Sequence, residues 1–126
     1  MPLGHRKCLL RAISGLAAAE TGITRAKPRP VVIVQDDSFD ATDSITVCAF
    51  TTDQTEAPLF RLPVKPNDRN GLFATTRLMV DKITTVPKSK VGAQIGRLDD
   101  EDILRLNRAI LVFRGLAISP RARLEG

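Results

Sequence analysis

Arg29 is the residue whose surroundings in this sequence most favour a chemical role. It lies between Pro28 and Pro30, and an uninterrupted apolar run, residues 31–34, follows at once. Because proline fixes its own φ and restricts the residue before it, the backbone on both sides of Arg29 is held. A held backbone reduces the entropy lost when a guanidinium binds a phosphate with its planar fork of donors. From the residues alone, a solvated charge at a strand end is the competing interpretation.

Thr51 and Thr52 are the second feature of this kind. They follow residues 45–50, a run whose composition is typical of a strand neighbouring the one after Arg29. Their hydroxyls are therefore expected at the same rim of the sheet as Arg29. Threonines at strand ends are common, so the prediction depends on the arginine and the threonine together and not on either one alone.

Other chemistries lack the residues that they need. His5 is the only imidazole, which excludes Ser-His-Asp and Cys-His arrangements, and glycine-rich phosphate loops are missing. Cys8 and Cys48 are far apart in sequence, and Cys48 lies within an apolar run, which favours a buried reduced thiol over a disulfide or a metal pair. Helix capping explains the acids at 99–102 better than a divalent metal does. We expect no metal and no cofactor.

The overall composition is that of one soluble domain. The chain has 126 residues, 43% hydrophobic and 26% charged, and no apolar run approaches the ~20 residues of a membrane-spanning helix. It has five Phe but no Trp or Tyr, so stacking on aromatic rings is not expected to be its main device if it binds nucleic acid. Residues 1–26 hold +3 of the net charge of +5, so a polyanion partner must be argued from a site and not from the total charge.

Strand patterns dominate the chain after residue 26. The run 31–34 is apolar on both faces, as in a central strand covered on two sides, whereas the run that contains Pro63 alternates like an edge strand. Acids and serine indicate a loop at 36–43, and Asn70-Gly71 indicates a tight turn. The predicted strands are residues 31–34, 45–50, 59–64, 78–80, 83–86 and 95–98.

One helix is predicted near the end of the chain. Asp99 is placed to cap it, the acids that follow complement the positive end of its dipole, and Gly115 ends it. Its apolar residues recur at helical spacing: Ile103, Leu106, Ile110 and Phe113. Short strands, dense turns and one terminal helix predict a mainly β (α+β) fold, a compact antiparallel barrel or curled sheet with the helix packed on it. Residues 1–26 are expected to form a loosely helical or disordered leader, and 118–126 a tail.

Six consecutive motifs resemble the MazF/PemK family of toxin endoribonucleases: KPRPVVIVQDD, ITVCAFTTD, LFRLPV, NGL, RLMVDKITTVP and IGRLDDEDILRLNRAILVF. The resemblance covers about residues 27–117, which we take as the domain. It implies an SH3-like barrel with a C-terminal α-helix, a homodimer, and metal-independent, sequence-selective cleavage of single-stranded RNA (mRNA) in the cytoplasm. It also implies a cognate antitoxin protein whose tail blocks the RNA groove.

The resemblance also assigns roles to residues. The arginine of the R-P-V motif and the threonine that closes the next strand form the catalytic pair of the family, and they fall on Arg29 and Thr51. Arg29 would take part in proton transfer and hold the charge on the scissile phosphate, while Thr51 would donate a hydrogen bond to that phosphate. Base selection would come from the loops at 38–43 and 52–58. The candidate RNA-binding residues are Ser38, Thr52, Arg61, Lys65, Arg77 and Lys82.

The beginning of the chain departs from the family pattern. Family members start with a first strand that carries a GDIW-like motif, and no such motif occurs before Lys27. Because Arg11-Ala12-Ile13-Ser14-Gly15 can encode Gly-Asp-Ile-Trp in another frame, we hypothesise that residues 1–26 are a frame-shifted version of this strand and its loop. The sheet would then lack a strand and expose an edge. Phe73 also stands where close relatives often have a basic residue.

Two other functions compete with the toxin endoribonuclease. The first is a catalytically inactive MazF-like barrel that dimerises and binds antitoxin or toxin subunits without cutting RNA. The second is a small RNA-binding barrel, which the scarcity of aromatic residues disfavours.

Overall fold

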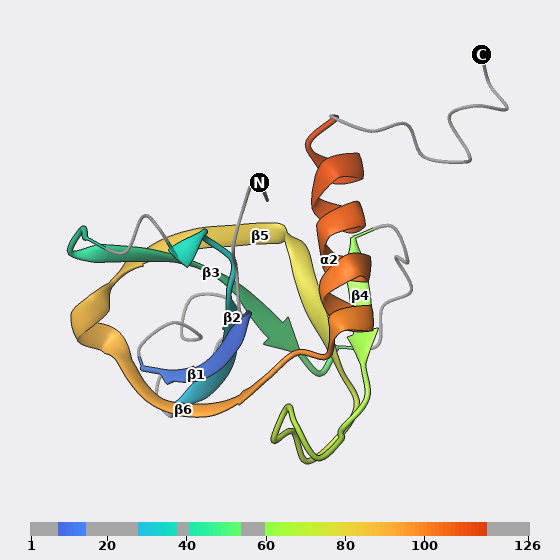
Figure 1. Cartoon of the computed structure of the whole chain (residues 1–126), viewed down its shortest axis with the longest axis horizontal. Coiled ribbons are helices and arrows are strands. Elements are labelled where there is room, and N and C mark those ends of the chain that lie inside the picture. The colour runs from blue at the N-terminus through green and yellow to red at the C-terminus, as the bar shows by residue number, and fades with distance from the viewer. Residues whose placement is uncertain (1–7, 15–27, 38–40, 54–59, 116–126) are drawn as a thin grey trace, which may run out of the picture.

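The protein is a curled antiparallel sheet with one long helix against it (Figure 1). The computed structural model describes residues 8–14, 28–37, 41–53 and 60–115. The elements are β1 (Leu9–Ile13), β2 (Arg29–Ile33), β3 (Ser44–Thr51), β4 (Arg61–Val64), β5 (Thr76–Pro87), the short 3-10 helix η2 (Lys88–Lys90), β6 (Val91–Arg97) and α2 (Asp100–Phe113). The mainly β fold with a C-terminal helix is thus confirmed.

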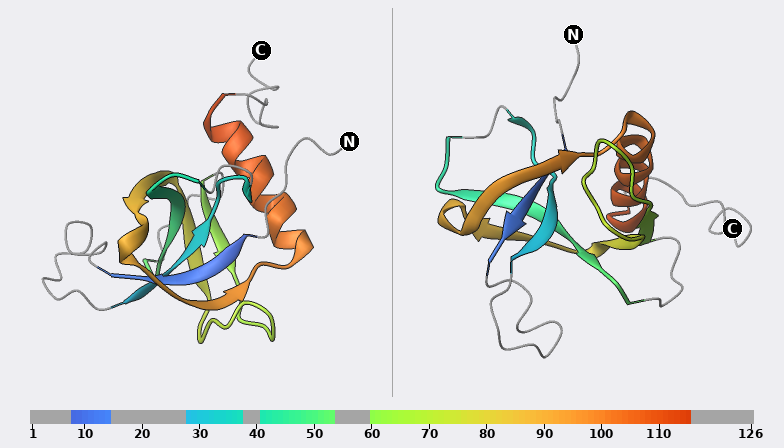
Figure 2. Two further views of the ribbon diagram at one scale, coloured as in Figure 1. Left: turned by 60° about the vertical axis from the view of Figure 1, so that its left-hand side comes forward. Right: turned by 90° about the horizontal axis from the view of Figure 1, so that it is seen from below.

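The sheet curls but does not close into a barrel. Its six strands are ordered β4-β5-β3-β2-β1-β6, and β4 and β6 are the two edges within the described residues. Both views in Figure 2 show the sheet wrapping around on itself. Strand β5 is long enough to pair with both β3 and β4. Its pairing with β3 shifts register between Cys48 and Phe50, and this irregularity allows the strand to bend. Of the barrel and the curled sheet that the sequence left open, the structure forms the curled sheet.

Two apolar clusters cover opposite faces of the central strands. Val32 belongs to the first apolar cluster and its neighbour Val31 to the second, because successive side chains of a strand point to opposite faces. The first cluster packs beneath α2 and contains Leu10, Cys48, Val64, Leu78, Val80, Leu98 and Leu106 among others. The second contains Ile13, Val31, Ile45, Val47 and Val86. The continuous apolar run of β2 and the predicted burial of Cys48 are explained by these two covered faces.

Strand β1 corrects the expected leader. Residues 9–13 are neither helical nor disordered; they pair with β2 on one side and with β6 on the other. Leu10 and Ile13 are buried in the first and second apolar clusters respectively. The expectation that the sheet would lack this strand is wrong, because backbone pairing needs only an extended chain with buried apolar side chains and not the GDIW motif.

Strands β5 and β6 are longer than their sequence patterns. Residues 78–80 and 83–86, predicted as separate strands, belong to the single strand β5. The predicted strand at 95–98 begins earlier, at Val91 of β6. Much of β6 is exposed and carries small residues, so its pattern is weak; pairing with β1 defines it.

Helix α2 begins as predicted but is capped differently. Asp99 is the N-cap residue, yet its side chain makes no capping hydrogen bond. Its Oδ2 instead accepts a 2.9 Å hydrogen bond from the amide nitrogen Nδ2 of Asn67, which competes for the carboxylate. Three acids in the first turn still complement the helix dipole. In the described ranges, no helix is long and apolar enough to cross a membrane.

The loop between β4 and β5, residues 65–75, is internally braced. Asn70 is fully buried, and its Oδ1 accepts hydrogen bonds from the backbone nitrogens of Asn67 and Leu72 while its Nδ2 donates to the carbonyl of Lys65. The backbone nitrogen of Arg97 in β6 donates to the carbonyl of Arg69 at 2.9 Å. Figure 1 and the left view of Figure 2 show this loop extending below the sheet. The loop therefore enters β5 from a fixed position.

Candidate active site

Arg29 and Thr51 lie at the same end of the ladder between β2 and β3. The last pair of this ladder joins Val31 to Ala49. Arg29 is two residues beyond Val31 on β2, and Thr51 is two residues beyond Ala49 on β3. Both positions are partly exposed. The structure therefore brings the two predicted catalytic residues to one rim of the sheet.

Strand alternation also places these residues on one face. Val31 lies in the second apolar cluster and Ala49 packs against it, so side chains two residues further along each strand are expected to face the same way. Ile13 of that cluster is the direct β1 partner of Arg29. Within the described residues, no hydrogen bond joins the guanidinium of Arg29 to the hydroxyl of Thr51.

Two hydrogen bonds fix Thr51. Its hydroxyl oxygen accepts a 3.1 Å hydrogen bond from the backbone nitrogen of Asp53, which leaves the hydroxyl proton to be donated elsewhere. Its carbonyl oxygen accepts a 2.7 Å hydrogen bond from the hydroxyl of Thr76 in β5. Thr76 is only 6% exposed. The sequence does not reveal Thr76, because nothing in the run Thr75-Thr76 indicates which hydroxyl faces a neighbouring strand.

Arg77 is a predicted RNA-binding residue that the fold brings next to Thr51 from a different strand. It is the direct partner of Thr51 across β3 and β5. One of its guanidinium nitrogens, Nη1, lies 3.4 Å from the carbonyl oxygen of Asp53, the residue that also holds the Thr51 hydroxyl. Because opposed residues of an antiparallel pair share a face, a second cation stands beside Thr51.

Arg61, by contrast, is engaged by a neighbouring carboxylate. Its Nε and Nη2 donate to Oδ1 and Oδ2 of Asp81 at 2.9 and 3.0 Å, and both side chains are largely buried. Burial acts to raise the pKa of Asp81, but the hydrogen bond and charge of Arg61 outweigh it and hold that pKa below its usual value of 3.8. The guanidinium also lies 6.0 Å from the ring centre of Phe60. These contacts join β4 to β5 and occupy the donors that RNA would need.

Three of the remaining candidates are exposed, and one lies outside the described residues. Thr52 follows Thr51 directly and is exposed, while Lys65 and Lys82 are exposed on the β4–β5 loop and on β5. Ser38 lies outside the described residues, as do residues 39–40 of the first loop and 54–58 of the second. Roles for these residues in RNA binding stay predictions.

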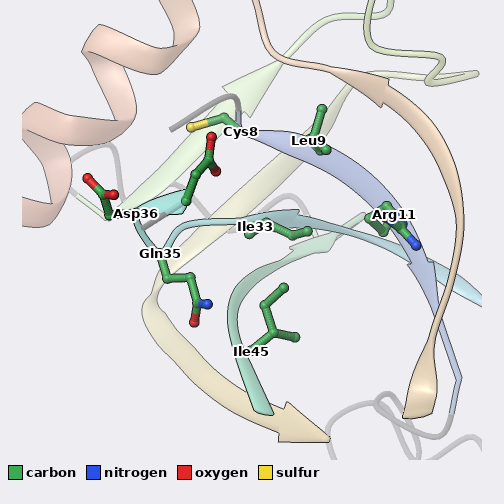
Figure 3. Close-up of a pocket in the computed structure, with 8 residues that line it drawn as sticks. Cys8, Leu9, Arg11, Ile33, Gln35, Asp36 and Ile45 are labelled. Carbon is green, nitrogen blue, oxygen red and sulfur yellow. The ribbon is translucent and has the colours of Figure 1, made fainter. Parts of the chain in front are cut away.

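A pocket of about 290 Å³ opens at the opposite end of β2 from Arg29 (Figure 3). Its lining is Cys8, Leu9, Arg11, Ile33, Gln35, Asp36, Asp37 and Ile45. The Oε1 of Gln35 accepts a hydrogen bond from the backbone nitrogen of Thr46, and Nε of Arg11 donates to the carbonyl of Gly92 at 2.7 Å. These side chains connect strands to one another. Among the described residues, no group of three or more His, Cys, Asp or Glu side chains could hold a metal ion.

Comparisons with known proteins agree with this fold. Residues 16–113 match the family described as PemK-like, MazF-like toxin of type II toxin-antitoxin system. A protein of Mycolicibacterium smegmatis, named probable endoribonuclease MazF, is 51% identical over 100 residues, which cover 79% of this chain and 92% of that one. The chain therefore belongs to the PemK/MazF toxin family, as its motifs predicted.

Solved structures show the same fold. The Mycobacterium tuberculosis toxin MazF-mt6 matches with a TM-score of 0.68 and 26% identity, over 86% of this chain and 98% of that one. A mycobacterial endoribonuclease in complex with its cognate antitoxin matches with a TM-score of 0.67 and 20% identity, over 94% of this chain and all of that one. The family match begins at residue 16, so β1 precedes it. A shift of reading frame as the origin of the first residues stays a hypothesis.

Proposed function

We propose that this MazF-class endoribonuclease toxin cuts single-stranded mRNA at selected sequences without a metal ion, and that Arg29 and Thr51 carry the reaction. The observation that supports the proposal most is their placement: both stand two residues past the last pair of one ladder, on one face, at an exposed rim. Placed donors of this kind stabilise developing negative charge without a metal.

The reaction that suits these groups is an internal transfer at phosphorus. The 2′-hydroxyl of the nucleotide before the cut loses its proton and attacks the adjacent phosphate, so that an O2′–P bond forms and the P–O5′ bond breaks. The leaving O5′ gains a proton, and the products carry a 2′,3′-cyclic phosphate and a 5′-hydroxyl. Charge builds on the non-bridging oxygens in between. Arg29 neutralises this charge and takes part in the proton transfer, and the free hydroxyl proton of Thr51 is donated to one of these oxygens.

Arg77 is the best supported contact to the RNA backbone beyond the pair. It is opposite Thr51, and one of its guanidinium nitrogens lies near the carbonyl oxygen of Asp53. Further contacts to the RNA backbone would come from Ser38, Thr52, Lys65 and Lys82. Arg61 would contribute least to RNA binding.

Partners follow from the same proposal. Helix α2 exposes Leu104 and Leu111, which lie seven residues apart on one face of the helix, and a second copy of the chain would cover these leucines in a homodimer. The RNA groove would be blocked by the tail of a cognate antitoxin, and a toxin that acts on mRNA would work in the cytoplasm. A complex with antitoxin is described for one of the structural relatives above.

Cleavage of a long single-stranded RNA tests the proposal. We expect the unaltered chain to cut it into discrete fragments, equally well with a metal chelator present. Arg29→Ala and Thr51→Val are each expected to lower the rate by about 10²-fold or more, as for other donors placed at developing charge. Arg108→Ala, which removes an exposed arginine of α2, is the matched control. Intact RNA with the unaltered chain removes the enzyme; equal cutting by Arg29→Ala removes the assigned site.

A further inference from the structure

Phe73 is an aromatic side chain that the described fold leaves entirely in solvent. It is 103% exposed, more than any of the other exposed large apolar residues in the described ranges. The three others, Leu104, Leu111 and Phe113, all belong to α2. Because the ring is fully exposed, both of its faces are available to a partner.

The position of Phe73 is fixed by the braced β4–β5 loop. Asn70 holds the loop from inside, and Gly71, with φ of 70°, packs against Ile95 of β6. Phe73 then precedes Thr76 by three residues, and Thr76 is bonded to Thr51. The backbone of Phe73 is thus at most ~14 Å from that of Arg77, the partner of Thr51. The loop that carries the ring therefore leads directly into the part of β5 that pairs with Thr51.

We propose that Phe73 is a stacking platform for a base of the RNA, on a nucleotide that flanks the scissile phosphate. This inference rests on the function proposed above and adds a subsite to it. A single ring is sufficient for stacking on a base, and every base has a face to offer. Arg77, four residues further along the chain and opposite Thr51, supplies positive charge for a neighbouring phosphate.

A base fits Phe73 better than a second protein chain does. A stable protein interface buries about 800 Å² on each partner, with a contiguous apolar centre. The residues next to Phe73 in the loop, Ala74 and Thr75, are exposed and small or polar, so the ring stands alone. The exposed leucines of α2, Leu104 and Leu111, share one helix face, which suits a second copy better.

The absence of Trp and Tyr from the chain makes a direct test possible. Phe73→Trp gives the protein a single tryptophan at the proposed platform. It is titrated with a pool of random-sequence, 20-nucleotide, fully 2′-O-methylated RNA, which lacks the attacking hydroxyl and stays intact. We expect the tryptophan emission to fall by half or more as RNA binds. Phe113→Trp, on α2, is the matched control and is expected to keep its emission.

Affinity for the same RNA pool gives a second readout. Loss of one base–aromatic stack should weaken binding by roughly 5- to 150-fold in Phe73→Ala and Phe73→Leu, whereas Phe73→Tyr should bind as the unaltered chain does. Unchanged emission of Phe73→Trp on binding, or full affinity of Phe73→Leu, overturns the inference. Emission that changes with protein concentration in the absence of RNA also overturns it, since a second copy would then cover the ring.

The failure of this inference differs from a failure of the proposed catalysis. If Arg29→Ala stops cutting while RNA leaves the tryptophan emission unchanged, the catalytic site stands and the platform does not. If no variant cuts RNA but the emission still falls, the chain binds RNA at Phe73 and the proposed chemistry is wrong.

Discussion

The hydroxyl of Thr76 donates a 2.7 Å hydrogen bond to the carbonyl oxygen of Thr51, across the boundary between β5 and the last residue of β3. Thr76 is almost completely buried, so this bond has little competition from water. It fixes the backbone of the residue that we propose to donate to the phosphate. Because the geometry of a donor at the reacting phosphate decides its effect, Thr76 acts as a positioning residue.

Replacing Thr76 by Val should therefore lower kcat by about 10- to 100-fold with little change in KM, because the shape is kept and the hydrogen bond is lost. Thr76→Ser restores the hydroxyl and should restore most of kcat. Single-turnover cleavage of RNA measures both variants, and chemical unfolding checks that they are folded. A rise in KM alone, or a Ser variant as slow as the Val variant, contradicts the positioning role.

Strand β1 should contribute strongly to stability, although it precedes the family match. Leu10→Ala removes a fully buried side chain from the first apolar cluster and should lower the free energy of unfolding by about 2–5 kcal/mol. Leu9→Ala, in the same strand but only partly buried, should cost clearly less. Urea unfolding of both variants measures the difference. Equal, small losses would mean that β1 does not pair with the sheet in solution.

The contact between β6 and the β4–β5 loop should tolerate no side chain at Gly96. A Cβ there would lie 2.3 Å from the carbonyl oxygen of Arg69, which is backbone and cannot move aside. We expect Gly96→Ala to destabilise the protein by about 1–3 kcal/mol. Gly92→Ala in the same strand meets its nearest atom at 3.4 Å and is the control. Thermal unfolding measures both variants. If Gly96→Ala proved as stable as Gly92→Ala, or more stable, this packing would be contradicted.

The ion pair of Arg61 and Asp81 should give stability that depends on pH. Because the folded pKa of Asp81 lies below its usual value, the contribution is present above the unfolded pKa and is lost as pH falls through the folded one. Asp81→Asn should cost about 1–2 kcal/mol near neutral pH, a difference that shrinks below about pH 4. Asp102→Asn, in the ion pair of α2, is the control and should cost less. A cost for Asp81→Asn that persists in acid would contradict the assignment.

Cys48 should make the protein less stable in alkali. Burial and the charge of Asp81 raise the pKa of its thiol from 9.0 to about 12. A raised folded pKa means that the stability is complete below pH 9 and falls as pH rises towards 12, by up to about 1.4 kcal/mol per pH unit. Cys48→Val should remove this part of the slope, measured by urea unfolding between pH 8 and 11. Equal slopes in both proteins, or rapid alkylation of native Cys48 at neutral pH, would be the contrary result.

Local sequence patterns identified the elements that neighbouring residues are sufficient to determine. The helix at the end of the chain combines acids in its first turn with apolar residues at helical spacing, and it forms as Asp100–Phe113. The run after Arg29 has apolar residues for both faces, and it becomes a central strand covered on both. The tight turn at Asn70-Gly71 forms as well, because Gly71 readily takes the positive φ that it needs.

Patterns failed where pairing with distant strands decides the structure. Residues 9–13 looked like part of a leader, and only the hydrogen bonds to β2 and β6 make them a strand. Asp81 and Lys82 appeared to interrupt β5, yet Asp81 is satisfied by Arg61 of the neighbouring strand. The carboxylate of Asp99 was expected to cap α2, but Asn67, far away in sequence, takes it.

By itself, the sequence determined the fold class, the family, and the two residues on which catalysis is proposed to depend, because turn formers, apolar spacing and the proline-flanked arginine act over a few neighbouring residues. Only the tertiary structure decided that Arg29 and Thr51 come to one rim, that Thr76 and Arg77 stand beside Thr51, and that Phe73 lies in open solvent. The physical reason is that strand register and side-chain exposure depend on contacts between residues far apart in the chain, which no local pattern records.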